Sequence, residues 1–198
     1  MVLKSGWNII SSFITVPNDS LKVMMNEIKP NINIMKNSAG KVYMPSANID
    51  QIYRWDITQG YQIHMLTNDT LPISGMKVNP TTTPIVFSTT GWKLVSYLRS
   101  STMNVADCMT ALTDRSSLTI AKNNAGKVYL PPSINTIGNM LPGEGYQLYL
   151  NKVDTLIYPA NSAGRSSLNE VQDYDARNIK LDYEFTGNNA SLILDKSC

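Results

Sequence analysis

Residues 37–45 read NSAGKVYMP and residues 123–131 read NNAGKVYLP, so one chain carries nearly the same nine residues twice. In each copy an Asn-x-Ala-Gly segment separates an alternating apolar run from the sequence Lys-Val-Tyr. A turn of this composition between two such runs predicts a β-hairpin. The turn needs a positive φ, which glycine adopts readily, so Gly40 and Gly126 are expected to supply it.

The duplication extends far beyond the nonapeptide. Matching residues lie 84 to 86 positions apart throughout, and the recurring pieces Gly-Trp, Gly-Tyr-Gln and Asp-Thr-Leu begin at Gly6 and Gly91, Gly60 and Gly145, and Asp69 and Asp154. The second glycine pair is expected where a turn re-enters a strand. Similarity at a fixed period predicts two tandem homologous modules of about 75–85 residues, module 1 at 1–78 and module 2 at 79–160.

Each module is predicted to be mainly β with one short helix, an α+β arrangement. Short runs rich in β-branched and aromatic residues, such as GWNIISSFI and GYQIHML, favour strands. Apolar residues spaced i, i+3, i+4, i+7 predict a three-turn helix after residue 19 and again after Asn104. The apolar centre of residues 81–90 predicts the first strand of module 2.

The last part of the chain, residues 161–198, has no counterpart in the duplication. It begins with a polar segment without a period, which is typical of a linker. KLDYEF and ASLILD then alternate around a TGNN turn, which predicts a β-hairpin. We interpret this part as the start of a truncated following domain or as a packing tail.

Composition and charge exclude several classes of partner. The net charge is +2 and the basic residues are scattered singly, so no basic stripe indicates nucleic-acid binding. No run is long and apolar enough for membrane insertion. The first residues lack the features of a signal peptide, which leaves an intracellular protein or a fragment of an exported one. The two cysteines form no framework, and Cys108 is expected to be a buried, inert thiol.

The residue patterns predict no enzyme: no catalytic residue, no metal and no cofactor. His64 is the only histidine and its counterpart is Tyr149, so a histidine-based metal site is excluded. Asp69 and Asp154 are the acids that recur, and turn chemistry at a strand start explains both. Exchange of Asp50 for Asn135 between the copies would preserve hydrogen bonding but abolish acid–base chemistry.

The tryptophans divide into two groups. Trp7 and Trp92 recur after glycine at strand starts and are expected to anchor the core. Trp55 aligns with Met140 in a predicted loop, so it is expected to form an exposed aromatic patch with its neighbours. The candidate ligand-binding residues are therefore Tyr53, Arg54, Trp55 and Tyr149.

As a combination, GWNIIS at 6–11, GKVYMP at 40–45, GKVYLP at 126–131 and GEGYQLYL at 143–150 resemble a family of tandem repeat modules in secreted and cell-surface Bacteroidetes proteins. FTGNNASLIL at 185–194 resembles the start of a β domain that follows such modules. The resemblance implies extracellular or cell-surface localisation through type IX secretion, beside binding or sorting domains of a longer polypeptide. It implies no enzymatic activity.

A second resemblance concerns glycosylation. Asp-Ser/Thr followed by an apolar residue resembles the O-glycosylation site of those bacteria, which makes Ser20, Thr70 and Thr155 candidate acceptors. The same residues are explained equally well by a helix cap and by strand starts.

Three functional hypotheses remain. The first is a non-catalytic structural or adhesive module pair within a larger surface protein, with protein or glycan partners at the cell surface. The second is a carbohydrate-binding module that uses exposed aromatic residues around Trp55. The third is a hydrolase, which would require two carboxylates facing each other across one cleft.

Overall fold

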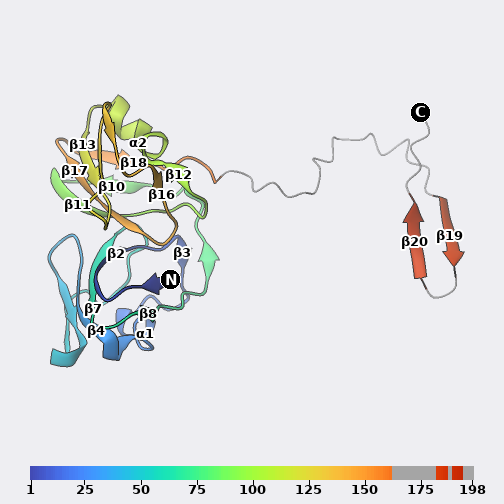
Figure 1. Cartoon of the computed structure of the whole chain (residues 1–198), viewed down its shortest axis with the longest axis horizontal. Coiled ribbons are helices and arrows are strands. Elements are labelled where there is room, and N and C mark those ends of the chain that lie inside the picture. Colours follow the sequence, from blue (N-terminus) through green and yellow to red (C-terminus); the bar gives the residue numbers. More distant parts are fainter. Residues whose placement is uncertain (162–181, 187–188, 194–198) are drawn as a thin grey trace. The chain divides into compact units, whose positions relative to one another are not determined.

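A computed structural model describes residues 1–161, 182–186 and 189–193. Strands make up most of its regular structure, so the predicted mainly β fold is confirmed at this level. Residues 1–161 belong to one compact unit. We call residues 1–78 the N-terminal half of this unit and residues 79–160 its C-terminal half. The blue-to-cyan N-terminal half lies below the green-to-orange C-terminal half in Figure 1.

Five strands of the N-terminal half form one antiparallel sheet. Their order across the sheet is β2 (Gly6–Ile10), β7 (Tyr61–Met65), β4 (Ile32–Lys36), β5 (Val42–Met44) and β6 (Ile49–Asp50). On β7 the residues Tyr61, Ile63 and Met65 are buried, while Gln62 and His64 lie on the opposite face. The sequence GYQIHML predicts this alternation because successive strand side chains point to opposite faces.

Five strands of the C-terminal half form a second sheet with the corresponding order. They are β11 (Gly91–Ser96), β17 (Gly145–Leu150), β13 (Leu118–Lys122), β14 (Val128–Leu130) and β15 (Ile134–Asn135). An irregularity recurs as well: the register shift between Ile32 and Ile34 in β4 has a counterpart between Leu118 and Ile120 in β13. The duplicated sequence segments thus occupy corresponding strands.

Shorter strands pair at the margins of the sheets. They are β1 (Val2–Leu3) with β8 (Asp69–Thr70), β10 (Ile85–Phe87) with β18 (Asp154–Leu156), β3 (Ile14–Thr15) with β9 (Met76–Lys77), and β12 (Met103–Asn104) with β16 (Asn139–Met140). The strand predicted within residues 81–90 is β10, and β8 and β18 contain the repeated Asp-Thr pair, so these predictions are confirmed.

The two predicted helices differ in length. Helix α2 (Val105–Asp114) spans the expected turns, and the Asn104 side chain accepts a hydrogen bond from the Ala106 N–H at its start. Helix α1 (Leu21–Met24) is a single turn, followed by turns and the 3₁₀ helix η1 (Lys29–Asn31). A second 3₁₀ helix, η2 (Pro45–Ala47), follows β5. The predicted three-turn helix is wrong for the N-terminal half.

Among the residues that the structure describes, helix α1 lacks a side-chain cap and is followed by a proline that limits how far a helix could continue. Within the described chain, the Ser20 side chain makes no capping hydrogen bond at the start of α1. Pro30 lies in η1 and has no N–H to continue the helical hydrogen bonds. Leu21, Met25 and Ile28 are nevertheless buried, so the apolar stripe packs without a continuous helix.

The repeated nonapeptide forms the predicted hairpin turn in both halves. Gly40 and Gly126 have φ values of 75° and 74°. The Asn37 side-chain oxygen accepts hydrogen bonds from the N–H groups of residues 39 and 41, at 3.0 Å each. Asn123 does the same for residues 125 and 127, at 3.1 and 3.0 Å. The first Asn and the Gly of the motif are therefore required by the turn itself.

Each half contains its own cluster of buried apolar residues. Trp55, with 5% of its surface exposed, belongs to the N-terminal cluster, and Met140 occupies the corresponding position in the C-terminal one. Trp7 and Trp92 are 49% and 46% exposed. The prediction that the two repeated tryptophans anchor the core is therefore wrong, because the strand alternation places them on the outer faces of their sheets.

Two strands are described beyond the compact unit. β19 (Asp182–Thr186) and β20 (Asn189–Ile193) pair antiparallel, as predicted for a hairpin in this part of the chain. The predicted linker falls on residues outside the described ranges.

Candidate functional site

The two halves meet at a junction in which each contributes corresponding segments. Two isolated backbone bridges cross it, one between Ile10 and Glu144 and one between Gln59 and Val95. Ile10 corresponds to Val95 in the duplication, and Gln59 to Glu144, so each bridge is the counterpart of the other. The junction is therefore reciprocal, like the interface of a two-fold symmetric dimer.

Repeated serines strengthen this junction. The Ser11 hydroxyl donates to the Glu144 carbonyl at 2.5 Å and accepts from the Tyr97 N–H at 3.0 Å. Its counterpart Ser96 donates to the Ser12 carbonyl at 2.9 Å. Ser11 and Ser96 are fully buried, so these hydrogen bonds satisfy hydroxyl groups that have no access to water.

The repeated glycines Gly60 and Gly145 allow the two halves to approach closely. A Cβ atom on Gly60 would lie 2.7 Å from the Val95 carbonyl oxygen, and one on Gly145 would lie 2.7 Å from that of Ile10. Both contacts are with backbone, which cannot swing aside. Both glycines lie where a turn re-enters a strand, as predicted, but neither is among the positive-φ residues of the described chain, so the close approach of the other half is what requires them.

The nonapeptide turns also take part in the junction. The Ser38 hydroxyl accepts a hydrogen bond from the Leu94 N–H at 3.1 Å, and Asn124 donates to the Trp7 carbonyl at 3.2 Å. Each turn thus contacts the tryptophan-bearing strand of the other half. Ile9 and Leu94 lie on the faces of their sheets that point away from the two cores, and among the described residues they belong to neither core cluster. Both are nevertheless buried, because they lie between the halves.

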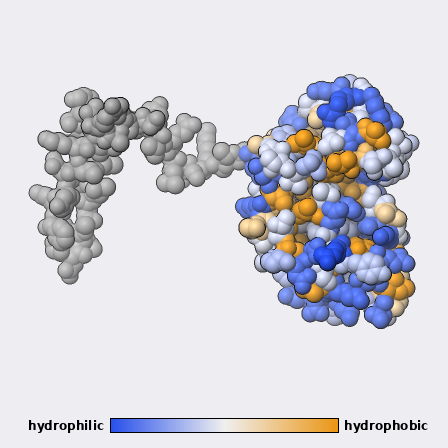
Figure 2. Space-filling view, turned by 180° about the vertical axis from the view of Figure 1, so that it is seen from behind, coloured by the Kyte–Doolittle hydropathy of each residue, from blue (hydrophilic) through white to orange (hydrophobic). Residues whose placement is uncertain are grey.

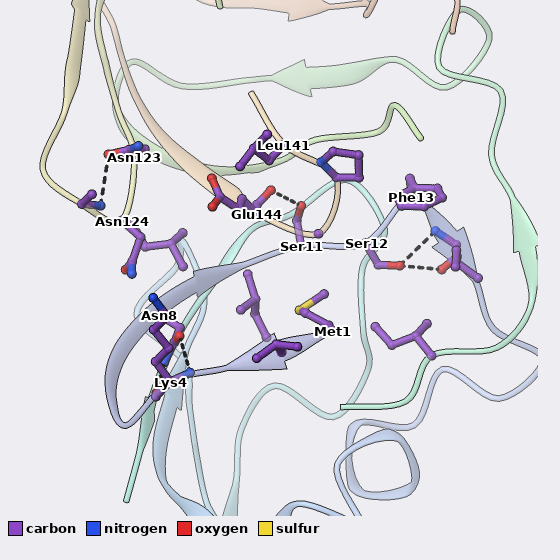
Figure 3. A pocket seen from close by; sticks show the side chains of 18 residues that line it. Met1, Lys4, Asn8, Ser11, Ser12, Phe13, Asn123, Asn124, Leu141 and Glu144 are labelled. Atoms are coloured by element: carbon purple, nitrogen blue, oxygen red, sulfur yellow. Dashed lines mark hydrogen bonds between the residues drawn. The ribbon is translucent and has the colours of Figure 1, made fainter. Parts of the chain in front are cut away.

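A hollow with a volume of about 600 Å³ lies at this junction. Figure 3 shows side chains of both halves around it, with Lys4 and Asn8 facing Asn124 and Glu144. The Asn8 amide is occupied by the backbone of its own loop, since it donates to the Lys4 carbonyl at 2.7 Å and accepts from the Lys4 N–H at 3.0 Å. The Glu144 carboxylate accepts a 3.0 Å hydrogen bond from the hydroxyl of Tyr146.

A second hollow of about 390 Å³ is lined by the corresponding positions on the other side of the junction. Asp56, Thr58 and Gln59 line it, and the Asp56 carboxylate accepts hydrogen bonds from both of the other residues. The acid of each hollow is thus engaged in local hydrogen bonds, and neither hollow places a histidine or a cysteine beside its acid. Among the described residues no group of His, Cys, Asp and Glu could hold a metal ion.

Two aromatic pairs lie on the outer faces of the sheets. Trp7 packs edge-to-face on His64, with ring centroids 5.1 Å apart, and Trp92 packs in the same way on Tyr149 at 5.4 Å. These residues face each other directly across neighbouring strands. His64 and Tyr149, which correspond in the duplication, thus occupy equivalent positions opposite the two tryptophans.

A lysine contacts each of these tryptophans. The Lys36 ammonium group lies 5.4 Å from the centre of the Trp7 ring, and that of Lys122 lies 4.9 Å from the centre of the Trp92 ring. The face shown in Figure 2 carries hydrophobic residues scattered among polar ones. The duplicated sequence therefore produces two matching surface groups, each composed of a tryptophan, an aromatic partner and a lysine.

The structure separates the four predicted ligand-binding residues. Trp55 is buried and stacks on Tyr61 with ring centroids 4.4 Å apart, so the predicted exposure of its indole is wrong. Tyr53 is exposed, and the Arg54 guanidinium forms a 2.8 Å ion pair with Asp19. Tyr149 lies in the other half, against Trp92. These residues do not form one patch.

The repeated acids have structural partners in both halves. The Asp69 carboxylate accepts hydrogen bonds from Asn31 and from the N–H of Thr70, which lower its pKa. Burial acts to raise the pKa of Asp154, but hydrogen bonds from Arg115, Ser117 and the next N–H outweigh it and lower that pKa. Both acids lie at the start of a strand, as predicted, but side chains distant in the sequence supply most of their hydrogen bonds.

The candidate glycosylation residues occupy the surface to different degrees. Thr70 is exposed, whereas Ser20 and Thr155 are half-buried. Their modification stays a prediction.

Cys108 is buried as expected, and the loss of hydration raises the pKa of its thiol to about 12, which keeps it protonated.

Sequence reasoning missed the paired surface groups around Trp7 and Trp92. One available signal was the match of Trp55 to Met140, since a position that accepts either Trp or Met is typical of a core. Another was the strict alternation of Gly-Tyr-Gln-x-x-x, which places His64 and Tyr149 on the face opposite the buried tyrosines.

Comparison with protein-family models, with curated proteins and with solved structures gives no significant match to the chain. Within residues 1–161, 182–186 and 189–193, no helix has the length and apolar character needed to cross a membrane.

Proposed function

We propose that residues 1–78 and 79–160 are two homologous modules that act together as a rigid, non-catalytic structural unit of a larger extracellular protein. The observation that carries this proposal is the reciprocal junction. Each half supplies a strand, a buried serine and a close-packed glycine to the other, at corresponding positions. Such an arrangement fixes the orientation of two modules and suits a spacer that holds neighbouring segments apart.

Rigidity follows from the nature of the contacts. Backbone hydrogen bonds cross the junction, including Ser11 N–H to the Gly143 carbonyl at 2.9 Å and Gly60 N–H to the Leu94 carbonyl at 3.1 Å. The apolar side chains of Ile9 and Leu94 are buried at the same junction. Because backbone groups carry these bonds, the halves cannot slide without leaving buried polar groups unsatisfied.

The absence of catalysis is part of the proposal. In both halves the recurring carboxylates, Asp69 and Asp154, accept several hydrogen bonds and have lowered pKa values. A general base or acid works best with a pKa near the working pH. These carboxylates support strand starts instead.

The extracellular location and a role in adhesion are supported by the resemblance to tandem modules of secreted Bacteroidetes proteins. A sequence rich in neutral Asn, Ser and Thr, with only 16% charged residues, agrees with it. An antibody against residues 1–161 is expected to label intact source cells. Labelling that requires lysis would contradict the location.

Calorimetry tests the rigid unit directly. Residues 1–161 are expected to unfold in a single transition whose van't Hoff enthalpy equals the calorimetric enthalpy. Two separable transitions, one for each half, would show that the junction does not couple them and would overturn the proposal.

A carbohydrate-binding role around Trp55 is not supported, because that indole lies in the core. The exposed indole of Trp92 offers a different place for such a role.

A further inference from the structure

A small groove lies between the outer face of the second sheet and the nonapeptide turn of the first. Its volume is about 240 Å³, and its lining includes Trp92, Gln62, Gln147, Lys36 and Lys93. The groove draws residues from both halves, so it exists only because the junction brings them together. It adjoins the hollow that contains Asp56 and shares lining residues with it, but it shares none with the hollow that contains Glu144.

The indole of Trp92 is both exposed and held in place. Tyr149 packs against it edge-to-face, and the Lys122 ammonium group lies over its ring. Aromatic and cation–π contacts of this kind fix the orientation of a ring without covering all of it. With 46% of its surface exposed, Trp92 presents a flat apolar area at the edge of a polar groove.

The polar side chains of the groove combine amides with positive charge. Gln62 and Gln147 each carry a donor and an acceptor group, and both belong to the repeated Gly-Tyr-Gln segments. Lys36 and Lys93 supply two ammonium groups, and the ammonium group of Lys93 also donates a hydrogen bond to the Thr89 hydroxyl at 2.5 Å. The described residues that line the groove include no carboxylate. The groove is therefore complementary to an anion that also carries hydroxyl groups and an apolar face.

We propose that this groove binds acidic oligosaccharides that contain uronic acid, a function beyond the structural one. The C–H face of a pyranose ring packs on the indole of Trp92, as apolar surfaces do on aromatic rings. The sugar carboxylate binds Lys36, and the ring hydroxyls exchange hydrogen bonds with Gln62 and Gln147. The groove admits one ring, so the remaining sugars of a chain extend over the sheet surface.

The test uses trigalacturonate and an alginate trimer as probes, titrated against residues 1–161 by calorimetry and by tryptophan fluorescence. Both acidic trimers are expected to bind. The fully methyl-esterified trigalacturonate has the same rings without the charge, and it is expected to bind at least tenfold more weakly. Lack of binding by both acidic trimers at 10 mM, or equal binding of the esterified one, overturns the proposal.

Matched variants separate this site from general attraction to a basic protein. Lys36→Gln is expected to weaken trigalacturonate binding at least fivefold, whereas Lys127→Gln, the same change at an exposed lysine away from the groove, is expected to leave it within twofold. Trp92→Ala is expected to weaken it at least tenfold. Equal effects of the two lysine changes, or equal binding of a single-stranded oligonucleotide, would indicate unspecific charge attraction and overturn the proposal.

The proposal and the structural function fail in different ways. Binding without cooperative unfolding would contradict only the rigid unit. Cooperative unfolding without binding would contradict only the saccharide site. Circular dichroism of each variant establishes that a lost affinity does not result from a lost fold.

Discussion

The N-terminal and C-terminal halves of the compact unit share a sheet order but differ in how they close their cores. In the N-terminal half, α1 is one turn long and lacks a side-chain cap within the described chain. In the C-terminal half, α2 has ten residues and a cap from Asn104. The strands and the junction correspond in both halves, while the helical segment does not. The contacts that join the two halves are thus kept in both copies, whereas the helical segment that covers each core differs.

The tryptophans make the same comparison at the level of single side chains. Trp55 occupies a core position that is filled by Met140 in the other half. Trp7 and Trp92 occupy equivalent surface positions and each keeps an aromatic partner and a lysine. A buried position tolerates different apolar side chains of suitable size, whereas the two surface positions both keep tryptophan.

Replacing a core tryptophan and a surface tryptophan should give the largest difference in the free energy of unfolding. Trp55→Ala removes a buried indole and its stacking on Tyr61, and is expected to lower the free energy of unfolding by about 4 kcal/mol. Trp92→Ala removes a half-exposed ring and is expected to cost about 1 kcal/mol. Urea unfolding of both variants measures the difference. Similar costs would show that the surface indole also supports the fold.

The glycines offer a second, smaller test. Gly145→Ala places a methyl group against the Ile10 carbonyl and is expected to cost about 2–3 kcal/mol. Gly126→Ala meets nothing within 4 Å and is expected to cost about 1–2 kcal/mol, from its positive φ alone.

Hydrogen exchange distinguishes the two mechanisms. Gly145→Ala should accelerate exchange of the Ser11 and Tyr97 N–H groups, which bond across the junction. Gly126→Ala should leave both unchanged. Unchanged exchange in both variants would contradict the role assigned to Gly145.

Local chemistry was predictable from the sequence, and contacts between the halves were not. The hairpin turns, with Gly40 and Gly126 at positive φ, follow from the nonapeptide alone. The need for Gly60 and Gly145 arises from the backbone of the other half, which no local pattern reveals.

The aromatic residues illustrate the same limit. The sequence showed that Trp7 lies on a strand, but not which face of that strand meets the core. It placed Trp55 in a loop, and it did not show that this loop folds back over the core and buries the ring. The groove at Trp92 combines residues from β4, β7, β11 and β17, which only the tertiary fold brings together.

The helix caps give a test of about 1 kcal/mol. Asn104→Ala removes the hydrogen bond to the Ala106 N–H and is expected to lower the free energy of unfolding by about 1 kcal/mol. Ser20→Ala is the matched change at the start of α1, where the side chain makes no capping bond in the described chain, and it should have little effect. Chemical denaturation of both variants measures the loss of unfolding free energy. Equal losses would contradict the conclusion that α2 has a side-chain cap and α1 does not.

The smallest expected effect concerns pH and the two repeated acids. The pKa values of Asp69 and Asp154 are lowered in the folded chain, so both stabilise it above their unfolded pKa of about 3.9, and this stability is lost as pH falls through the folded values. Asp154 pairs with the Arg115 guanidinium at 2.8 Å, whereas Asp69 pairs with the neutral amide of Asn31. Salt screens an ion pair at the surface more than a neutral hydrogen bond.

Urea unfolding midpoints, measured between pH 7 and pH 2.5 at low and at high salt, test this distinction. The loss of stability at low pH should have a salt-sensitive part, which Asp154→Asn abolishes. It should also have a salt-insensitive part, which Asp69→Asn abolishes. The same salt response from both variants would contradict this distinction.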